Sequence, residues 1–196
     1  MDCLSDIKQF LTFSTADDFY FLQILQRKKE NPQLGSNSRV IKNYYITSVE
    51  QLERKYPEII TLCKTFNARA MLRLNKRSFE QVAFKCLENV ANTMQNKEYL
   101  HISKCYDRAC GLLTSADTKK WIVDIDSPEV DMDVIKCTIN LCAPAGDKIL
   151  ALLPTKNGWH FITTPFNVAE FRQYTAAYIT QTIDIHKDNP INLYIP

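Results

Sequence analysis

Glycine is scarce in this 196-residue chain, which has only four, and no stretch approaches the roughly 20 apolar residues of a membrane helix. The start of the chain also lacks the basic segment and following apolar run of a secretory signal peptide. Neither sign of charge dominates, because 24 basic and 22 acidic residues give a formal net charge of +2. The sequence therefore predicts no membrane partner, and a nucleic-acid partner would require a local basic surface.

Seven cysteines are present, and an odd number cannot all pair within one chain. With so little glycine they are not typical of a loop-rich secreted scaffold, so we expect reduced cysteines and a cytoplasmic protein. His101, Cys105 and Cys110 lack the short paired spacing of a zinc site and have no evident fourth ligand, which favours buried structural cysteines. With 45% hydrophobic and 11% aromatic residues, the chain can bury one sizeable core as a single domain over residues 1–196.

Residues 1–115 predict an N-terminal αβ module. Apolar runs at 19–25 and 40–46 indicate two strands of a hairpin. Ser48 and Ser78 are each followed three residues later by glutamine, which is the pattern of a helix N-cap, and we expect Pro57 to break the first of these helices.

Basic residues cluster in two places of this first half. Residues 27–29, Arg-Lys-Lys, follow the first strand and form either a solvated strand end or a rim that contacts phosphate. In the alternating segment from Ala68 to Asn75, Arg69 and Arg73 share one strand face, which must meet solvent, acids or phosphates. With Arg77, these arginines are our candidates for nucleic-acid contacts.

Residues 116–196 predict a second half of different order. The pattern is strand, helix, strand, strand, helix, strand, which is typical of a four-stranded antiparallel sheet with both helices on one face, as in RRM-like domains. The fold class is therefore α+β. The expected strands lie at 121–126, 148–153, 159–163 and 182–185; helices begin at Asp131 or Asp133 and at Asn167; Asn157-Gly158 is the strongest turn signal; and 191–195 completes a last hairpin.

Acidic residues mark the first and last strands of this half. Asp124 and Asp126 are one residue apart, so on a strand they point to the same face. Two such carboxylates need a divalent cation, basic side chains or open solvent to offset their repulsion. His160 lies on the third strand and Asp184 on the last. Three acids converging with a histidine suit two-metal phosphoryl or nucleotidyl transfer, whereas each residue alone is also compatible with a solvated or salt-bridged structural role.

The motifs at residues 123–126, 155–160 and 183–184 resemble those of the archaeo-eukaryotic primase superfamily, which includes the primase-polymerases. The resemblance covers about residues 115–196. It implies a metal-dependent nucleotidyltransferase in which Asp124, Asp126 and Asp184 are catalytic ligands of Mg²⁺ or Mn²⁺ and in which His160, Lys156 and Thr155 bind the nucleotide. In the chain, Thr155 replaces the family's serine and Asn192 stands roughly where the family often has arginine.

The resemblance also implies partners: nucleoside triphosphates, a DNA or RNA template, and a helicase or other replication protein. A second hypothesis is a catalytically silent relative that binds a nucleotide, a nucleic acid or a partner protein on the same sheet surface. A metal-dependent nuclease is a third. The sequence does not separate them, because the residues expected around the triphosphate are only partly those of the family.

Overall fold

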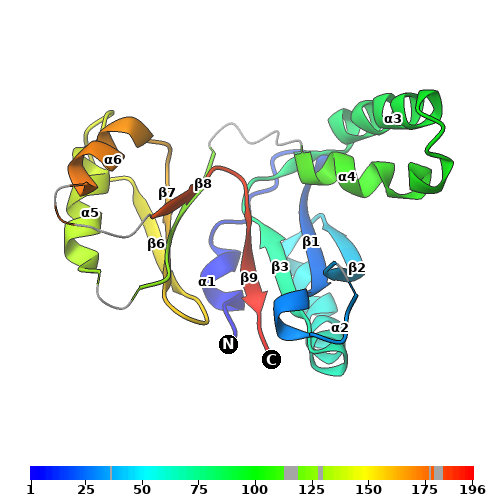
Figure 1. Cartoon of the computed structure of the whole chain (residues 1–196), viewed down its shortest axis with the longest axis horizontal. Helices are drawn as coiled ribbons and strands as arrows, with labels where there is room; N and C mark the ends of the chain where they lie inside the picture. The colour runs from blue at the N-terminus through cyan, green and yellow to red at the C-terminus, as the bar shows by residue number, and fades with distance from the viewer. Residues whose placement is uncertain (36, 113–118, 128–129, 177, 179–182) are drawn as a thin grey trace. The chain divides into compact units, whose positions relative to one another are not determined.

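A computed structural model describes residues 1–35, 37–112, 119–127, 130–176, 178 and 183–196 (Figure 1). The chain is α+β, and its strands form two antiparallel sheets. It divides into two compact units: the first comprises Met1–Ala116 and Pro190–Pro196, and the second comprises Asp117–Asn189. None of the helices in the described ranges is long and apolar enough to cross a membrane.

The sheet of the first unit has the strand order β2-β1-β3-β9, with a short strand, β4, paired to the start of β1. Neighbouring strands are antiparallel throughout. The predicted hairpin of the first two strands is confirmed, and β2 is an edge strand. The strands are β1 (Asp18–Gln26), β2 (Arg39–Ile46), β3 (Arg69–Arg73), β4 (Arg77–Ser78) and β9 (Pro190–Tyr194).

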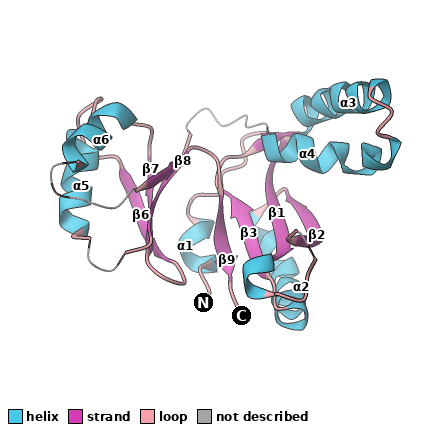
Figure 2. Cartoon of the chain, in the orientation of Figure 1, coloured by secondary structure: helices cyan, strands magenta, loops and turns pink. Residues whose placement is uncertain are grey.

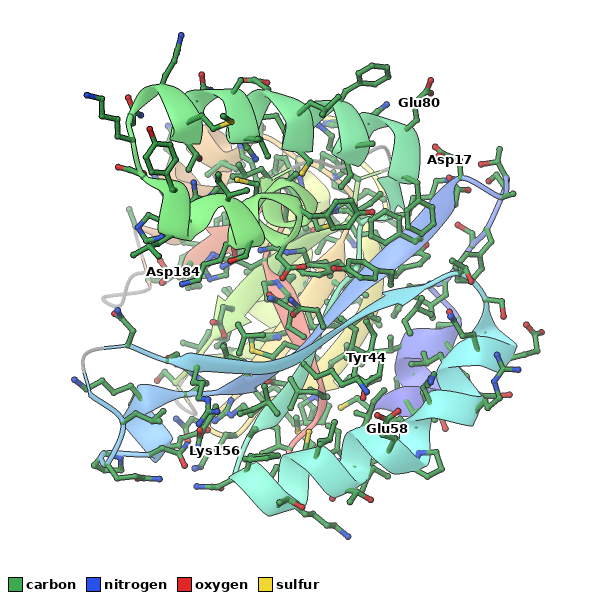
Figure 3. The ribbon with its side chains drawn as sticks, turned by 90° about the vertical axis from the view of Figure 1, so that its right-hand side faces the viewer. Asp17, Tyr44, Glu58, Glu80, Lys156 and Asp184 are labelled. Atoms are coloured by element: carbon green, nitrogen blue, oxygen red, sulfur yellow. The ribbon has the colours of Figure 1, made fainter. Side chains whose placement is uncertain are left out.

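Helices cover both faces of this sheet. Figure 3 shows the β1–β2 pair running between α3 and α4 on one side and α2 on the other. Phe19 and Phe21 of β1 pack against Val82, Ala109 and Cys110 of α3 and α4. The helical segments are α1 (Leu4–Lys8), α2 (Val49–Phe66), α3 (Phe79–Gln95) and α4 (Cys105–Leu112), with 3-10 segments η1 (Lys28–Glu30) and η2 (Tyr99–Lys104).

Both predicted N-caps are confirmed: the hydroxyls of Ser48 and Ser78 accept hydrogen bonds from the backbone N–H three residues on, at 3.0 and 3.1 Å. The expectation that Pro57 breaks the helix is wrong, because α2 is continuous through it. A proline inside a helix costs about 3 kcal/mol. Residues before and after Pro57, Leu52 and Ile59 among them, are buried where α2 packs against the sheet, which offsets that cost.

The second unit follows the strand and helix order expected from the sequence. Its sheet has the order β6-β7-β5-β8, with all neighbours antiparallel, and Figure 2 shows α5 and α6 together on one side of it. Asp131 and Asn167 are the helix N-caps, as expected. The predicted end of the second helix near Tyr178 and start of the last strand at 182 fall partly outside the described residues. The elements are β5 (Trp121–Ile125), α5 (Met132–Leu141), β6 (Ile149–Pro154), β7 (Trp159–Thr163), α6 (Val168–Thr175) and β8 (Asp184–His186).

One core joins this sheet to its helices. Val123 and Ile125 of β5 pack with Phe161 of β7, Ile135 of α5 and Phe171 of α6. Because side chains alternate along a strand, the residues between them point to the opposite face of the sheet. That alternation places Asp124 on the face away from the two helices.

The expected last hairpin is not formed. Residues 190–194 form β9, which pairs with β3 in the first sheet and not with β8. The reason is burial: Ile191 and Leu193 are 1% and 0% exposed in the first unit. The first unit therefore keeps the last seven residues, which the sequence had assigned to the second half.

Candidate functional site

The candidate site is a row of polar residues across the middle of the second sheet. On β5, Asp124 is the register partner of His160 on β7 and, on its other side, of Asp184 on β8. Residues directly opposite each other in antiparallel strands project from the same face, with Cβ atoms about 4.5–5.5 Å apart. The structure thus brings together three of the predicted site residues from segments up to 60 residues apart in sequence (184 − 124).

Asp124 is the electrostatic centre of this row. Its Oδ1 lies 3.1 Å from Nε2 of His160, and its Oδ2 lies 3.9 Å from Nε2 of His186. Contact with His160 lowers the pKa of Asp124 and outweighs the effect of partial burial, so this carboxyl is ionised at neutral pH. Oδ1 is buried, and by strict angular criteria it receives no hydrogen bond from the described residues, so it can still accept one more partner. A buried anionic oxygen in that state is suited to accept a cation.

The other two carboxylates are more open. Asp126 is exposed just beyond the end of β5, and Asp184 is exposed at the start of β8. Within the described ranges, no three histidine, cysteine, aspartate or glutamate side chains are placed to hold a metal ion. Carboxylate oxygens are the donors that Mg²⁺ and Mn²⁺ prefer, and the backbone register makes Asp124 and Asp184 cross-strand neighbours. Asp126 would have to turn toward them from the strand end.

The turn from Thr155 to Gly158 lies against the end of the acid-bearing strand. A Cβ added at Gly158 would lie 1.9 Å from the carbonyl oxygen of Ile125 and 3.1 Å from Cα of Asp126. The Thr155 hydroxyl accepts hydrogen bonds from the backbone N–H groups of Asn157 and Gly158, at 3.3 and 2.9 Å, so it stabilises the turn itself. A glycine is required here because any side chain would collide with the neighbouring backbone.

Lys156 is not brought to the row. It is exposed on this turn, and Figure 3 shows it apart from Asp184. Of the residues expected to bind the nucleotide, His160 is therefore the one that the structure places beside the acids. Thr155 and Lys156 lie in the turn that joins β6 to β7.

The three candidate arginines belong to the first unit, and two of them are engaged inside it. Arg69 is 5% exposed and forms an ion pair with Glu30, with Nε donating to Oε2 at 3.0 Å. Arg77 is 0% exposed, and its Nε donates to the carbonyl oxygen of Cys110 at 2.8 Å. Buried guanidinium groups in these positions do not reach a nucleic acid at the surface, so burial argues against the role predicted for Arg69 and Arg77. Arg73 is partly exposed, with its guanidinium near Gly111.

His186 is a residue of this site that the sequence reasoning missed. Its signal was present: it lies two residues after Asp184, so both side chains share one strand face. It lies beside Asp124, and it adds a second imidazole to the row.

Comparison of the chain with protein-family models, with curated protein sequences and with solved structures gives no match. The chain is thus not assigned to a family by these comparisons. What the site does has to be argued from its residues and from their placement on the sheet.

Proposed function

We propose that the second unit carries out metal-dependent nucleotidyl transfer of the primase-polymerase type. One observation carries this proposal: His160, Asp124 and Asp184 form a continuous row across three neighbouring strands. These are the central residues of the three motifs that resemble the primase superfamily. The strand order β6-β7-β5-β8 with both helices on one face also supports an RRM-like arrangement for this unit.

Each residue has a distinct role in the proposal. Asp124 and Asp184, joined by Asp126, would hold Mg²⁺ or Mn²⁺, and such ions stabilise the attacking and leaving oxygens of a phosphoryl group. His160 would donate a hydrogen bond from its imidazole to a phosphate of the incoming nucleoside triphosphate. Gly158 keeps the turn of the second motif against the strand of the first, which fixes His160 in register with Asp124.

The test is primer extension. The full chain is incubated with a primer-template, labelled nucleoside triphosphates and Mg²⁺ or Mn²⁺, and the products are separated by size. Asp124→Asn removes a metal ligand and one charge while keeping nearly the same shape, so we expect extension to fall by at least about 100-fold with little change in stability.

A matched control is Asp147→Asn. Asp147 is an exposed aspartate of the same unit that precedes β6 and lies outside the polar row. We expect it to leave extension unchanged. If the purified chain extends no primer with either ion, or if Asp124→Asn extends as well as the wild type, the proposed function is wrong.

A second candidate is a silent relative that binds nucleic acid or nucleotide without catalysis. The observation that favours it is the burial of Arg69 and Arg77, which removes two expected basic contacts. Under this alternative, nucleotide binding would be measurable by titration calorimetry while extension stays absent. Binding that is unaffected by Asp124→Asn would then point away from a metal-bound triphosphate.

A further inference from the structure

A basic groove lies in the first unit, between the edge strand β2 and helix α4. Its volume is about 790 Å³, within the range of pockets that hold small organic ligands. Figure 3 faces this side of the first unit and shows α4 on one side of the β1–β2 pair. The groove is lined by Gln23, residues 38–43, Lys104, Asp107 and Arg108.

The groove carries a net positive charge. Arg39, Lys104 and Arg108 are all exposed, and none of them forms an ion pair with another described residue. Lys42, which also lines the groove, forms an ion pair with Glu58 of α2. Three cations without an ion pair in one groove attract a ligand with several negative charges.

The single acid of the lining, Asp107, offsets part of the positive charge but forms no ion pair with these cations. Asp107 accepts hydrogen bonds from Nδ2 of Asn43 and from the hydroxyl of Tyr45, each at 2.6 Å. Both of its oxygens therefore join α4 to β2. The acid shapes the groove and leaves the three cations available to a ligand.

The basic character continues at one end of the groove. The backbone N–H of Lys28 donates to the hydroxyl of Ser38 at 3.1 Å, which places η1 beside the start of β2. Lys29 belongs to the same short segment, so the basic run at 27–29 adjoins the groove. A second cluster of cations thus lies next to the groove residue Ser38.

We propose that this groove binds the phosphate backbone of single-stranded nucleic acid. Lysine and arginine contact phosphates, while the amides of Gln23 and Asn43 and the hydroxyl of Ser38 are suited to sugars and base edges that an unpaired strand leaves accessible. No aromatic side chain lines the groove within the described residues, so base stacking contributes little and binding has little sequence preference. The choice of nucleic acid over another polyanion rests on the proposed function.

The test compares two double variants of equal charge. Lys104→Ala with Arg108→Ala removes two groove cations, and Arg54→Ala with Lys64→Ala removes two exposed cations from α2, on the other face of the sheet. Binding of a fluorescently labelled oligothymidylate is measured by anisotropy at several salt concentrations, with a chelator and without nucleotide. Each phosphate contact contributes about 0.7 to the slope of log K against log salt for single strands.

We expect the groove variant to lose about 1.4 units of that slope, which corresponds to roughly 25-fold weaker binding near 0.1 M salt, and the α2 variant to bind like the wild type. Equal losses in both variants would mean a diffuse charge effect and would overturn the proposal. The proposal would also be wrong if the groove bound a duplex, an acidic peptide or inorganic triphosphate more tightly than the oligothymidylate. The comparison is made at equal concentration of negative charge. Circular dichroism checks that both variants are folded.

This outcome is separable from that of the proposed function. Binding is measured under conditions in which no transfer can occur, and Asp124→Asn should bind the oligonucleotide like the wild type. Groove-dependent binding without primer extension would support the groove and contradict the enzyme. Primer extension that is unchanged in the groove variant, together with unchanged binding, would contradict the groove and support the enzyme.

Discussion

Gly158→Ala tests the close approach between the turn of the second motif and the strand of the first. The added Cβ would lie 1.9 Å from the carbonyl oxygen of Ile125, whereas close carbon–oxygen contacts between strands are about 3.3 Å. The overlap of roughly 1.4 Å falls on backbone atoms, so no side chain can rotate away to relieve it. The turn has to move, and the register of Trp159 with Ile125 moves with it.

The expected loss of stability follows from that overlap. Inserting a methyl group into a packed site costs about 1–3 kcal/mol, and a backbone collision belongs at the upper end of this range. For a chain of this size, each kcal/mol lowers Tm by about 2–4 °C, so we expect a decrease of about 6–12 °C. Differential scanning calorimetry is the assay, because it resolves separate transitions if the two compact units unfold independently.

Gly35→Ala is the matched control for this prediction. A Cβ at Gly35 would meet no atom within 4 Å, and the position does not require a left-handed backbone. Alanine there should be neutral or slightly stabilising, since it restricts the unfolded chain. If Gly158→Ala melts at the same temperature as Gly35→Ala and the wild type, the strand and the turn are not in contact, and the site as described is wrong.

Three further predictions concern charge and thiols. Burial alone would raise the pKa of Asp18, but hydrogen bonds from Lys76 and two backbone N–H groups to its carboxylate lower it. The stability that the ionised Asp18 contributes is therefore complete above the ordinary pKa of about 3.9, and it is lost as pH falls through the lowered pKa of the folded state. Urea unfolding should show Asp18→Asn less stable than the wild type at neutral pH, and a gap that fails to close in acid would contradict the assignment. Arg69→Ala should lower the free energy of unfolding by about 3 kcal/mol, because Glu30 loses this buried partner. Replacing both residues, Arg69→Met with Glu30→Leu, should cost less. A double-mutant cycle that shows no coupling energy would contradict the ion pair. All seven cysteines are free. A maleimide should modify the exposed Cys137 first in the native protein, and the buried cysteines only on unfolding. Fewer than seven reactive thiols in denaturant without reductant would show a disulfide.

Local signals in the sequence predicted the starts of the helices. Ser48 and Ser78 form N-caps through contacts that span three residues, so the pattern contains both partners. The alternation also placed Asp124 and Asp126 on one strand face, but β5 ends at Ile125, so Asp126 lies beyond the strand. Such predictions depend on neighbours along the chain, and those neighbours can be read directly.

Non-local partners could not be predicted in this way. The strand pattern placed Arg69 on a polar face, but its acid partner, Glu30, is 39 residues away and belongs to a different element. Ile191 and Leu193 have the alternation of a strand, yet nothing nearby indicates which sheet buries them. The groove cations come from β2, η2 and α4, and only folding brings these segments together.

The turn at Asn157-Gly158 was predicted for a different reason from the one observed. Asn-Gly is typical of turns that need positive φ, but neither residue is among the positive-φ positions of the described chain. The glycine is needed because the turn presses on the backbone of Ile125. A steric requirement of that kind depends on a strand more than 30 residues earlier (158 − 125 = 33), so the sequence showed the turn and not its cause.

The return of β9 to the first sheet makes the second unit an insertion within the first. The chain leaves the first unit after Ala116 and re-enters it at Pro190, so a truncated chain that stops near residue 115 loses an edge strand along with the inserted unit. Ile191 and Leu193 would then be missing from the core that they fill. Residues 117–189, by contrast, can be excised as one continuous segment with their own sheet and helices intact. Dissection of the two units should therefore proceed by removing the insert and bridging its ends, and not by shortening the chain from its C-terminus.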